Sequence, residues 1–479
     1  MMTGRAITTE GGDRALVDRC RAVLRDRPDA VVGPVALSLV TGVLVTHNAL
    51  FALVVLVAVP LLFVIVRVPS VSSAALLLLA VPLMRPMILG EDLSAVATIL
   101  ALAAALLAWI DDRGSVRSDA AARTLVIFVA AIWAWILLLL SARTTFPVGD
   151  TLRGLVTVPV TVAAATIVLR NERRRTLVLK GVVAATIALC ASYAVTYLLW
   201  RAGGYDFARI GRVRAGYEGR LTPLYAPFTA TYSTVSIGGI PRFLGIAREP
   251  GMMAALLAWA FFMLPRIGWE RRRWQLLIVV GLLGTQSTAG FGVFLMVWVS
   301  ERFILRSGRS AFGVFLRRSA GVAVAVLAGW IAWYAPVFGV QAKTDFNQAS
   351  VDVRSIAMDR GIQAVTQHPW GQDLVGADAV NSAINIVASI AVLGIPGFLL
   401  GASAVALPAV LSRQRRQALA PIGVILCTVA VSQPLTHSTA LLLAVALAAA
   451  SYTTQEPPGG TIGPPPPSVP PRKRLPVAA

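Results

Sequence analysis

Charged side chains are scarce in this sequence: they make up 14% of its 479 residues, whereas soluble proteins carry about 25%. Hydrophobic residues account for 57% of the chain, and long apolar runs recur from Val31 to Ala450. Such runs are typical of transmembrane helices. The composition therefore excludes a cytosolic enzyme and a secreted domain, and it predicts a polytopic membrane protein.

Several functional motifs are also missing. The three cysteines, Cys20, Cys190 and Cys427, are too few and too scattered for a disulfide framework. The absence of a Gly-x-x-x-x-Gly-Lys-Ser/Thr motif excludes an ATP-driven pump. No His/Cys cluster has the spacing of metal ligands, so we expect no metal and no cofactor. Residues 1–29 are polar, so we expect no cleavable signal peptide.

The apolar segments predict an all-α membrane helix bundle of about 12–14 transmembrane helices over residues 30–452. They lie at 31–46, 49–66, 71–89, 93–110, 124–141, 154–169, 176–200, 249–265, 274–300, 319–340, 381–411, 418–433 and 436–451. In residues 1–29, the apolar spacing over 13–25 predicts an amphipathic helix on the cytoplasmic membrane surface. Residues 453–479 are rich in proline and glycine, which predicts a disordered tail.

The net charge of +20 arises mainly from arginines between the apolar segments. These arginines cluster within 170–175, 266–273, 302–318, 413–416 and 472–474. The positive-inside rule places the clusters and both termini in the cytoplasm, so the charge does not by itself indicate nucleic-acid binding. Two long loops, 201–248 and 341–380, then face outward. Asp111 and Asp112 fall on the cytoplasmic side, where we interpret them as a solvated turn.

Residues 274–300 are too few for two full spans of about 20 residues each. We interpret them as a short buried hairpin with a polar tip, Thr285-Gln286-Ser287-Thr288, lining a cavity open to the outside. The alternative is a pair of longer helices whose ends run into the arginine-rich loops.

The loop 201–248 is rich in arginine despite its predicted outer position. It contains seven arginines and no lysine, together with Tyr205, Phe207, Tyr217, Tyr225, Phe228, Tyr232 and Phe243. Arginine binds phosphate oxygens through paired N–H groups, and aromatic faces suit sugar rings. This composition indicates a surface for a lipid-linked glycan. A solvated loop without function is the alternative.

The loop ends in a distinctive segment, residues 241–251, directly before an apolar span. Pro250 suits the first turn of a helix and places Glu249 at the helix start. An ionisable pair at a membrane boundary, here Arg248 and Glu249, is a candidate functional site. The alternative is that Glu249 only caps the helix and pairs with Arg248.

The spacing Arg242-x-x-Gly245-x-x-x-Glu249-Pro250 resembles the central motif of the O-antigen ligase and polymerase superfamily, which includes Wzy-like polysaccharide polymerases and WaaL-like ligases. The hairpin tip at 285–287 resembles the family's Thr-x-Ser-Arg hairpin, with Thr288 in place of the arginine. Further resemblances lie at Arg354, 368–371, Gly376, 381–382 and 393–397. Together the resemblance covers residues 176–440.

The resemblance implies a GT-C-type helical fold and a metal-independent glycosyltransferase. Such enzymes transfer an oligosaccharide from a polyprenyl (undecaprenyl or decaprenyl) pyrophosphate carrier to an acceptor glycan or lipid, at the outer face of the bacterial cytoplasmic membrane. The expected setting is exopolysaccharide or cell-wall assembly, with other assembly proteins as further partners. By position, Arg242, Arg248 and Arg354 would hold the pyrophosphate, where charge develops.

One departure from the family concerns the acceptor base. Ligases of this group have a histidine where this chain has Asn381, and asparagine cannot take a proton. Glu249, His368 and Asp378 are the candidates for that role. The predicted catalytic residues are Arg248, Glu249, Arg354, His368 and Asp378. The predicted substrate-binding residues are Arg242, Arg220, Arg214, Arg360, Ser287 and Asn381.

A transporter that flips lipid-linked oligosaccharides is the competing hypothesis. Such a protein should carry charges along the centres of several spans, giving access from both sides. Here the span interiors are nearly free of charge, with Arg85 and Lys180 near span ends. The charge pattern therefore favours an enzyme that works on one face.

Overall fold

The computed structural model is mostly helical, with thirteen α-helices and one four-stranded sheet among its described residues. Contacts divide the chain into two units, Met1–Ser72 and Ser73–Ala479, and almost all described residues belong to the second. The structure describes residues 69–85, 87, 89–112, 120–141, 148–204, 207–215, 220–232, 240–304, 310–334, 341, 348–371, 386–412, 414–431 and 438–452. The predicted amphipathic helix, the first two predicted spans and the C-terminal tail lie outside this part of the chain.

Every predicted apolar segment in this part overlaps a helix. The first helices are α4 (Pro69–Ala80), α5 (Gly90–Asp111), α6 (Ala120–Ser141), α7 (Val148–Val168) and α8 (Glu172–Gly203). A 3₁₀ turn, Val81–Leu83, follows α4. The later helices are α9 (Pro250–Met263), α10 (Arg272–Gly284), α11 (Thr288–Val299), α12 (Ala311–Tyr334), α14 (Gln348–Gln367), α15 (Ile386–Leu411), α16 (Arg415–Val431) and α17 (Thr439–Ser451). A 3₁₀ turn, Pro265–Ile267, follows α9, and a π-helical turn, Ser300–Ile304, follows α11.

Four helical segments of the described chain are long and apolar enough to cross a membrane. They are Leu93–Asp111, Ala120–Ser141, Glu172–Gly203 and Ile390–Leu411. Large apolar side chains on the helices also remain exposed, among them Ile99 and Ile127 at 64% and Val326 at 67%. Lipid tails would cover such side chains in a bilayer. These features fit a multi-pass membrane protein.

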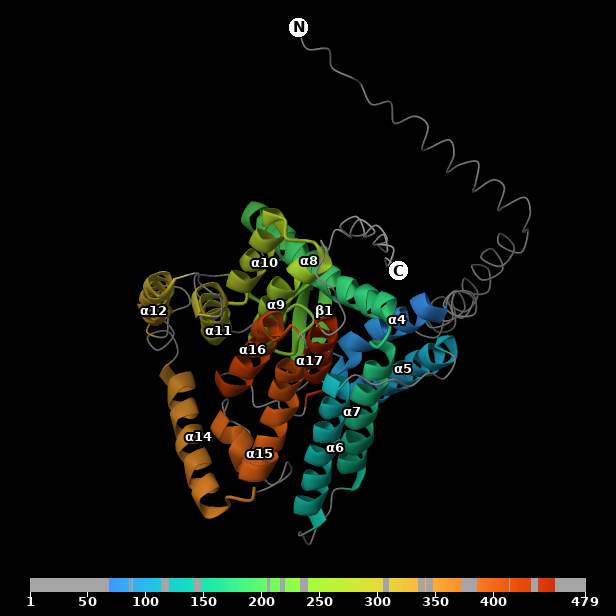
Figure 1. Ribbon diagram of the computed structural model, residues 1–479. Coiled ribbons are helices and arrows are strands. Elements are labelled where there is room, and N and C mark those ends of the chain that lie inside the picture. The colour runs from blue at the N-terminus through green and yellow to red at the C-terminus, as the bar shows by residue number, and fades with distance from the viewer. Residues whose placement is uncertain are drawn as a thin grey trace, which may run out of the picture. The chain divides into compact units, whose positions relative to one another are not determined.

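Helix α9 lies at the centre of its neighbours. It packs against α8, α10, α11 and α16, which surround it in Figure 1. Its side chains are buried on nearly every side, including Met253, Trp259 and Met263. A helix that is apolar all round is stable only inside a larger assembly. Helix α9 is therefore a fixed support for the residues at its two ends.

The all-α prediction missed a small sheet formed by the loop between α8 and α9. Its strands are β1 (Arg209–Ala215), β2 (Arg220–Tyr225), β3 (Thr229–Tyr232) and β4 (Arg242–Phe243). The strands are antiparallel and pair in the order β1-β2-β3-β4, with Val213 opposite Thr222 and Thr231 opposite Phe243.

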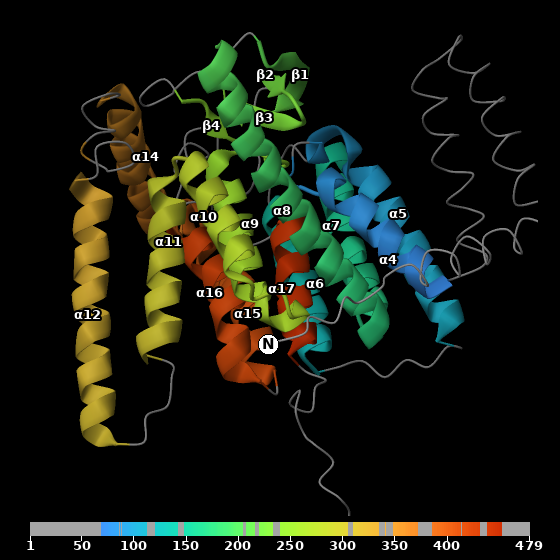
Figure 2. The ribbon, with the colours of Figure 1, turned by 90° about the horizontal axis from the view of Figure 1, so that it is seen from above.

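The helix assembly has two ends that differ in composition. The sheet end holds the four strands and the start of α9, and the basic end holds the start of α8, residues 265–273 and the end of α17. Figure 2 shows the strands and α14 together at its upper end. At the basic end, Arg174 is fully buried and pairs with Asp111 at 2.8 Å and with Asp112. These aspartates lie at a partly exposed turn, as interpreted, and their pairing with Arg174 also joins α5 to α8.

Candidate functional site

Hydroxyl groups fix the sheet to α8. The Thr229 hydroxyl of β3 lies 2.7 Å from the Ser192 hydroxyl and 2.8 Å from the Thr196 hydroxyl. Thr196 also donates to the Ala226 carbonyl oxygen, at 2.6 Å. All three hydroxyl residues are buried. Buried hydrogen-bond networks of this kind rigidify the groups that they join, so the sheet has a defined position on α8.

Aromatic packing reinforces the same junction. The Tyr193 ring stacks on Phe243 with centroids 4.8 Å apart, and Trp200 meets Tyr225 edge-on at 5.0 Å. Phe243 and Tyr225 are buried by these contacts. The prediction that their rings face a sugar is therefore wrong. Phe207, which is 69% exposed, remains open to a ligand.

The segment from β4 to α9 presents the central motif. Leu244 and Ala247 are fully buried, and the Leu244 amide donates to the Ala230 carbonyl oxygen at 3.0 Å. Gly245 has a φ of +60°, and a Cβ there would lie 2.5 Å from the Met253 sulfur. The motif's glycine thus permits a left-handed turn against α9.

The ionisable residues of this motif lie just outside that buried backbone. Arg242, Arg248 and Glu249 are all half-buried, and the Nε atom of Arg248 is enclosed by protein. Glu249 occupies the N-cap position of α9, as predicted, but its side chain makes no capping hydrogen bond. The alternative that Glu249 serves as a side-chain cap is therefore wrong.

The structure confirms that residues 274–300 turn back at 285–287, between α10 and α11. The helices also extend into the arginine-rich stretches, as the alternative expected, because α10 begins at Arg272 and the helical run after α11 continues to Ile304. That the tip lines a cavity open to the outside stays a prediction. Helices α10 and α11 have 13 and 12 residues, about 20 Å each at 1.5 Å per residue. The tip residues Thr285, Gln286 and Ser287 are buried at 0%, 4% and 7% exposure.

The hairpin tip contacts the β4 segment directly. Arg242 Nε donates to the Thr285 carbonyl oxygen at 3.3 Å, and Gln286 Nε2 donates to the Ile240 carbonyl oxygen at 2.8 Å. Gln286 adopts a left-handed φ of +49°, a conformation that costs free energy and marks a constrained position. Ser287 accepts a hydrogen bond from the Gly290 amide at 3.1 Å and so caps α11. Its hydroxyl hydrogen can still serve a ligand.

The turn between α4 and α5 also packs at the sheet end. Met87 forms an isolated antiparallel bridge with Ala247. The Arg85 carbonyl oxygen accepts hydrogen bonds from Ser438 Oγ and the Ala440 amide, both at 3.0 Å. The start of α17 therefore lies at the same end as the motif.

The loop 341–380, predicted to face outward, contains α14, and its residues 369–371 pack on a kink at Gly394 in α15. Gly371 and Gly394, with φ of +103° and +70°, cross so closely that a Cβ on Gly394 would lie 2.2 Å from the Trp370 carbonyl carbon. The Ile395 amide donates to the Pro369 carbonyl oxygen at 2.9 Å. Two stretches singled out in the sequence, 368–371 and 393–397, therefore meet in space.

Trp135 of α6 holds this crossing. Its indole N–H donates to the Leu393 carbonyl oxygen at 2.7 Å, and its ring lies 6.4 Å from that of Trp370. Sequence reasoning did not identify Trp135, since it lies in an apolar run far from both stretches. The indole N–H groups of Trp133 and Trp135 within one predicted span were the available signal, because a buried tryptophan usually finds an acceptor.

The predicted site residues whose side chains are described fall into two groups. Arg242, Arg248, Glu249 and Ser287 lie in the connected region formed by β4, the α9 start and the hairpin tip. Arg360 and His368 are exposed on or just after α14. Figures 1 and 2 show α14 to one side of the strands. The backbones of Arg214, Arg220 and Arg354 lie in β1, β2 and α14, and the structure does not describe their side chains. Asp378 and Asn381 lie outside the described residues.

Two further observations concern possible ligands. A cavity of about 300 Å³ between α15 and α16 is lined by apolar side chains that include Phe398, Val405 and Leu426. Such a lining fits a hydrocarbon chain.

Among the described residues, no three His, Cys, Asp or Glu side chains gather as metal ligands would.

Comparison with protein-family models, curated proteins and solved structures found no match to this chain.

Proposed function

We propose that the chain is a membrane glycosyltransferase that moves oligosaccharide units from a polyprenyl pyrophosphate carrier to an acceptor glycan or lipid at the outer face of the bacterial cytoplasmic membrane. One observation carries this proposal. Two arginines and a glutamate are held half-buried between β4, the α9 start and the hairpin tip. Positive charge fixed on a rigid, partly dehydrated surface suits a leaving pyrophosphate.

The arginines would bind the carrier. Arg242 donates its Nε–H to the Thr285 carbonyl oxygen, which orients the guanidinium, and guanidinium N–H groups suit phosphate oxygens. Arg248 follows six residues later, after the buried turn. The apolar cavity between α15 and α16 could accommodate part of an isoprenoid chain, which supports a lipid-linked donor.

The reaction is a displacement at the sugar. An acceptor hydroxyl attacks the anomeric carbon, the bond to the pyrophosphate oxygen breaks, and that oxygen keeps the electron pair. The hydroxyl proton passes to a base, for which Glu249 is the candidate within the described site. Its side chain makes no capping hydrogen bond, and it adjoins Arg248, which under this proposal binds the leaving pyrophosphate.

A variant series in proteoliposomes tests the proposal. We expect Arg248→Ala and Arg242→Ala to reduce glycan product formation by about 10² to 10³, the usual effect of removing one group that stabilises developing charge. Arg209→Ala removes an exposed arginine of β1 and should retain near-normal rates. Near-normal product formation by both site variants would refute the pyrophosphate role.

Metal dependence gives a separate test of the same proposal. Since charge stabilisation is assigned to arginine, product formation should continue unchanged in EDTA. Inhibition by EDTA with rescue by a divalent cation would show that the transfer requires a metal.

A further inference from the structure

A cavity at the basic end lies far from the proposed catalytic site. It encloses about 130 Å³ and is lined by Arg175, Thr176, Leu179 and Lys180 of α8, Arg266 and Ile267 after α9, and Ser451 of α17. Glu249 and Arg266 flank opposite ends of α9, whose 14 residues span about 21 Å. The cavity therefore belongs to neither the sheet end nor the hairpin tip.

The cavity lining is strongly basic. Three of the seven lining residues are cationic and none is acidic. Arg175 is 2% exposed, Arg266 is half-buried and Lys180 is exposed. Burial lowers the pKa of the Arg266 guanidinium, against opposing effects of Tyr452 and of Glu172. A bound anion would offset the cost of holding these cations away from water.

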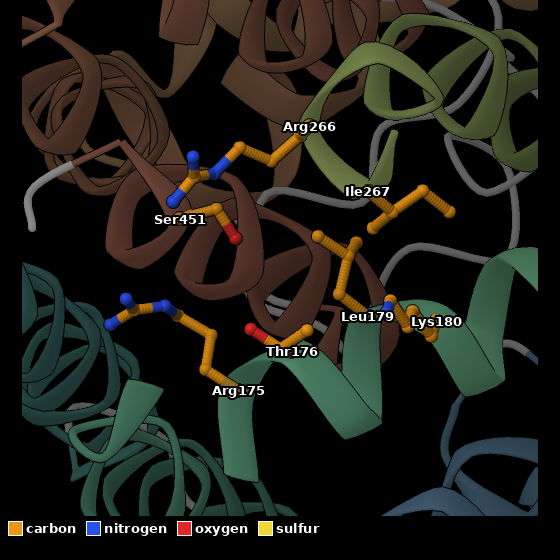
Figure 3. Close-up of a pocket in the computed structure, with 7 residues that line it drawn as sticks. All are labelled: Arg175, Thr176, Leu179, Lys180, Arg266, Ile267 and Ser451. Carbon is orange, nitrogen blue, oxygen red and sulfur yellow. The ribbon is translucent and has the colours of Figure 1, made fainter. Parts of the chain in front are cut away.

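The cavity also contains a polar group without a partner. The Ser451 hydroxyl oxygen is enclosed by protein, and no hydrogen-bond partner for it occurs among the described residues. Ser451 is 1% exposed. Figure 3 shows the Ser451 and Thr176 hydroxyls between the Arg266 and Arg175 side chains. An enclosed unsatisfied hydroxyl beside cations indicates a missing acceptor.

The lining is rich in donor groups of the kind that such an acceptor needs. A guanidinium has five N–H groups, and Arg175 directs one of them toward the Leu169 carbonyl oxygen, a long contact of 3.5 Å. Arg266 lies over the Tyr452 ring, with its Cζ 5.7 Å from the centroid, which fixes its stem at the cavity wall. Guanidinium and hydroxyl donors approaching from several directions suit a tetrahedral oxyanion better than a flat carboxylate.

We propose that this cavity binds a phosphate group, supplied by the headgroup of an anionic phospholipid of the cytoplasmic leaflet or by free phosphate. Basic pockets between helices on the cytoplasmic side bind such headgroups, and the exposed Lys180 gives the cavity an edge that lipid can reach. The bound phosphate would tie the start of α8 to the end of α17. This inference is independent of the proposed catalytic function.

Thermal unfolding and native mass spectrometry of the full chain in neutral detergent test this site. Phosphatidylglycerol should bind and raise the unfolding temperature, while phosphatidylcholine should do neither. Arg266→Gln and Ser451→Ala should each weaken binding by on the order of tenfold, the usual consequence of losing a hydrogen bond to a charged group. Lys180→Gln should also weaken binding. Because Lys180 is exposed, this substitution should not disturb folding, so its effect is a check on the two variants at more buried positions.

Arg272→Gln is the matched control, because it removes the same charge from an exposed position at the same end. It should bind the lipid as wild type does. Saturable inorganic phosphate binding with the same variant dependence would support the site with a soluble source. Equal lipid and phosphate binding by wild type and by an Arg266→Gln/Lys180→Gln double variant would overturn the proposal, as would no binding of either probe by wild type.

Discussion

Two glycines, Gly371 and Gly394, determine how the segment after α14 packs against α15. Both have positive φ, and their backbones are in direct contact. Any side chain would force these backbones apart and away from Trp135. The stretches 368–371 and 393–397 were singled out only by their resemblance to the family, and their contact with each other could not be derived from local propensity. Such pairings depend on the tertiary fold.

Gly394→Ala should therefore destabilise the protein by about 3 kcal/mol, through backbone strain and overpacking together. Gly329→Ala is the control, since a Cβ there meets nothing within 4 Å, and alanine favours a helix. Thermal unfolding in detergent measures both variants. Equal unfolding temperatures for Gly394→Ala and wild type would contradict the crossing.

At the scale of elements, the sequence predicted the helices much better than the loops. Pro250 and the apolar run after it located α9 to within two residues, because these signals are local. The sheet was missed, since its strands carry arginines and pair with one another rather than forming an apolar alternation. Arg174 was counted only as part of a basic cluster, although it is buried between α5 and α8.

Arg174→Gln should destabilise the α5–α8 junction, because it leaves two aspartates without their cation. We expect a loss of about 2 kcal/mol, less than for a fully enclosed pair, since the Asp111 and Asp112 side chains remain 28% and 21% exposed. Arg173→Gln, at the exposed neighbouring position, should have little effect. Chemical unfolding compares the two, and equal stabilities would refute the structural role.

At the scale of the whole molecule, the proposed account separates two ends. The sheet end carries the proposed transfer chemistry outside the membrane, and the basic end faces the cytoplasm by the positive-inside rule. Glu249 and Arg266, at opposite ends of α9, mark this division. Residues 242–249 are contiguous, so the sequence alone places them in one region. Whether Arg354 and His368 converge on that region depends on contacts between separate loops, which local sequence patterns do not encode.

Labelling of single cysteines tests this orientation in intact cells. In a background without native cysteines, Arg209→Cys at the sheet end should react with a membrane-impermeant thiol reagent. Glu270→Cys, exposed at the basic end, should react only after the cells are opened. The reverse pattern would invert the topology.

The most direct measurement of the central claim is the release of polyprenyl pyrophosphate by the purified protein supplied with a carrier-linked oligosaccharide and no other protein. We predict release by wild type and almost none by Arg248→Ala. An intact lipid that remains bound to wild type in an Arg248-dependent way, with no release, would contradict a glycosyltransferase and favour a flippase.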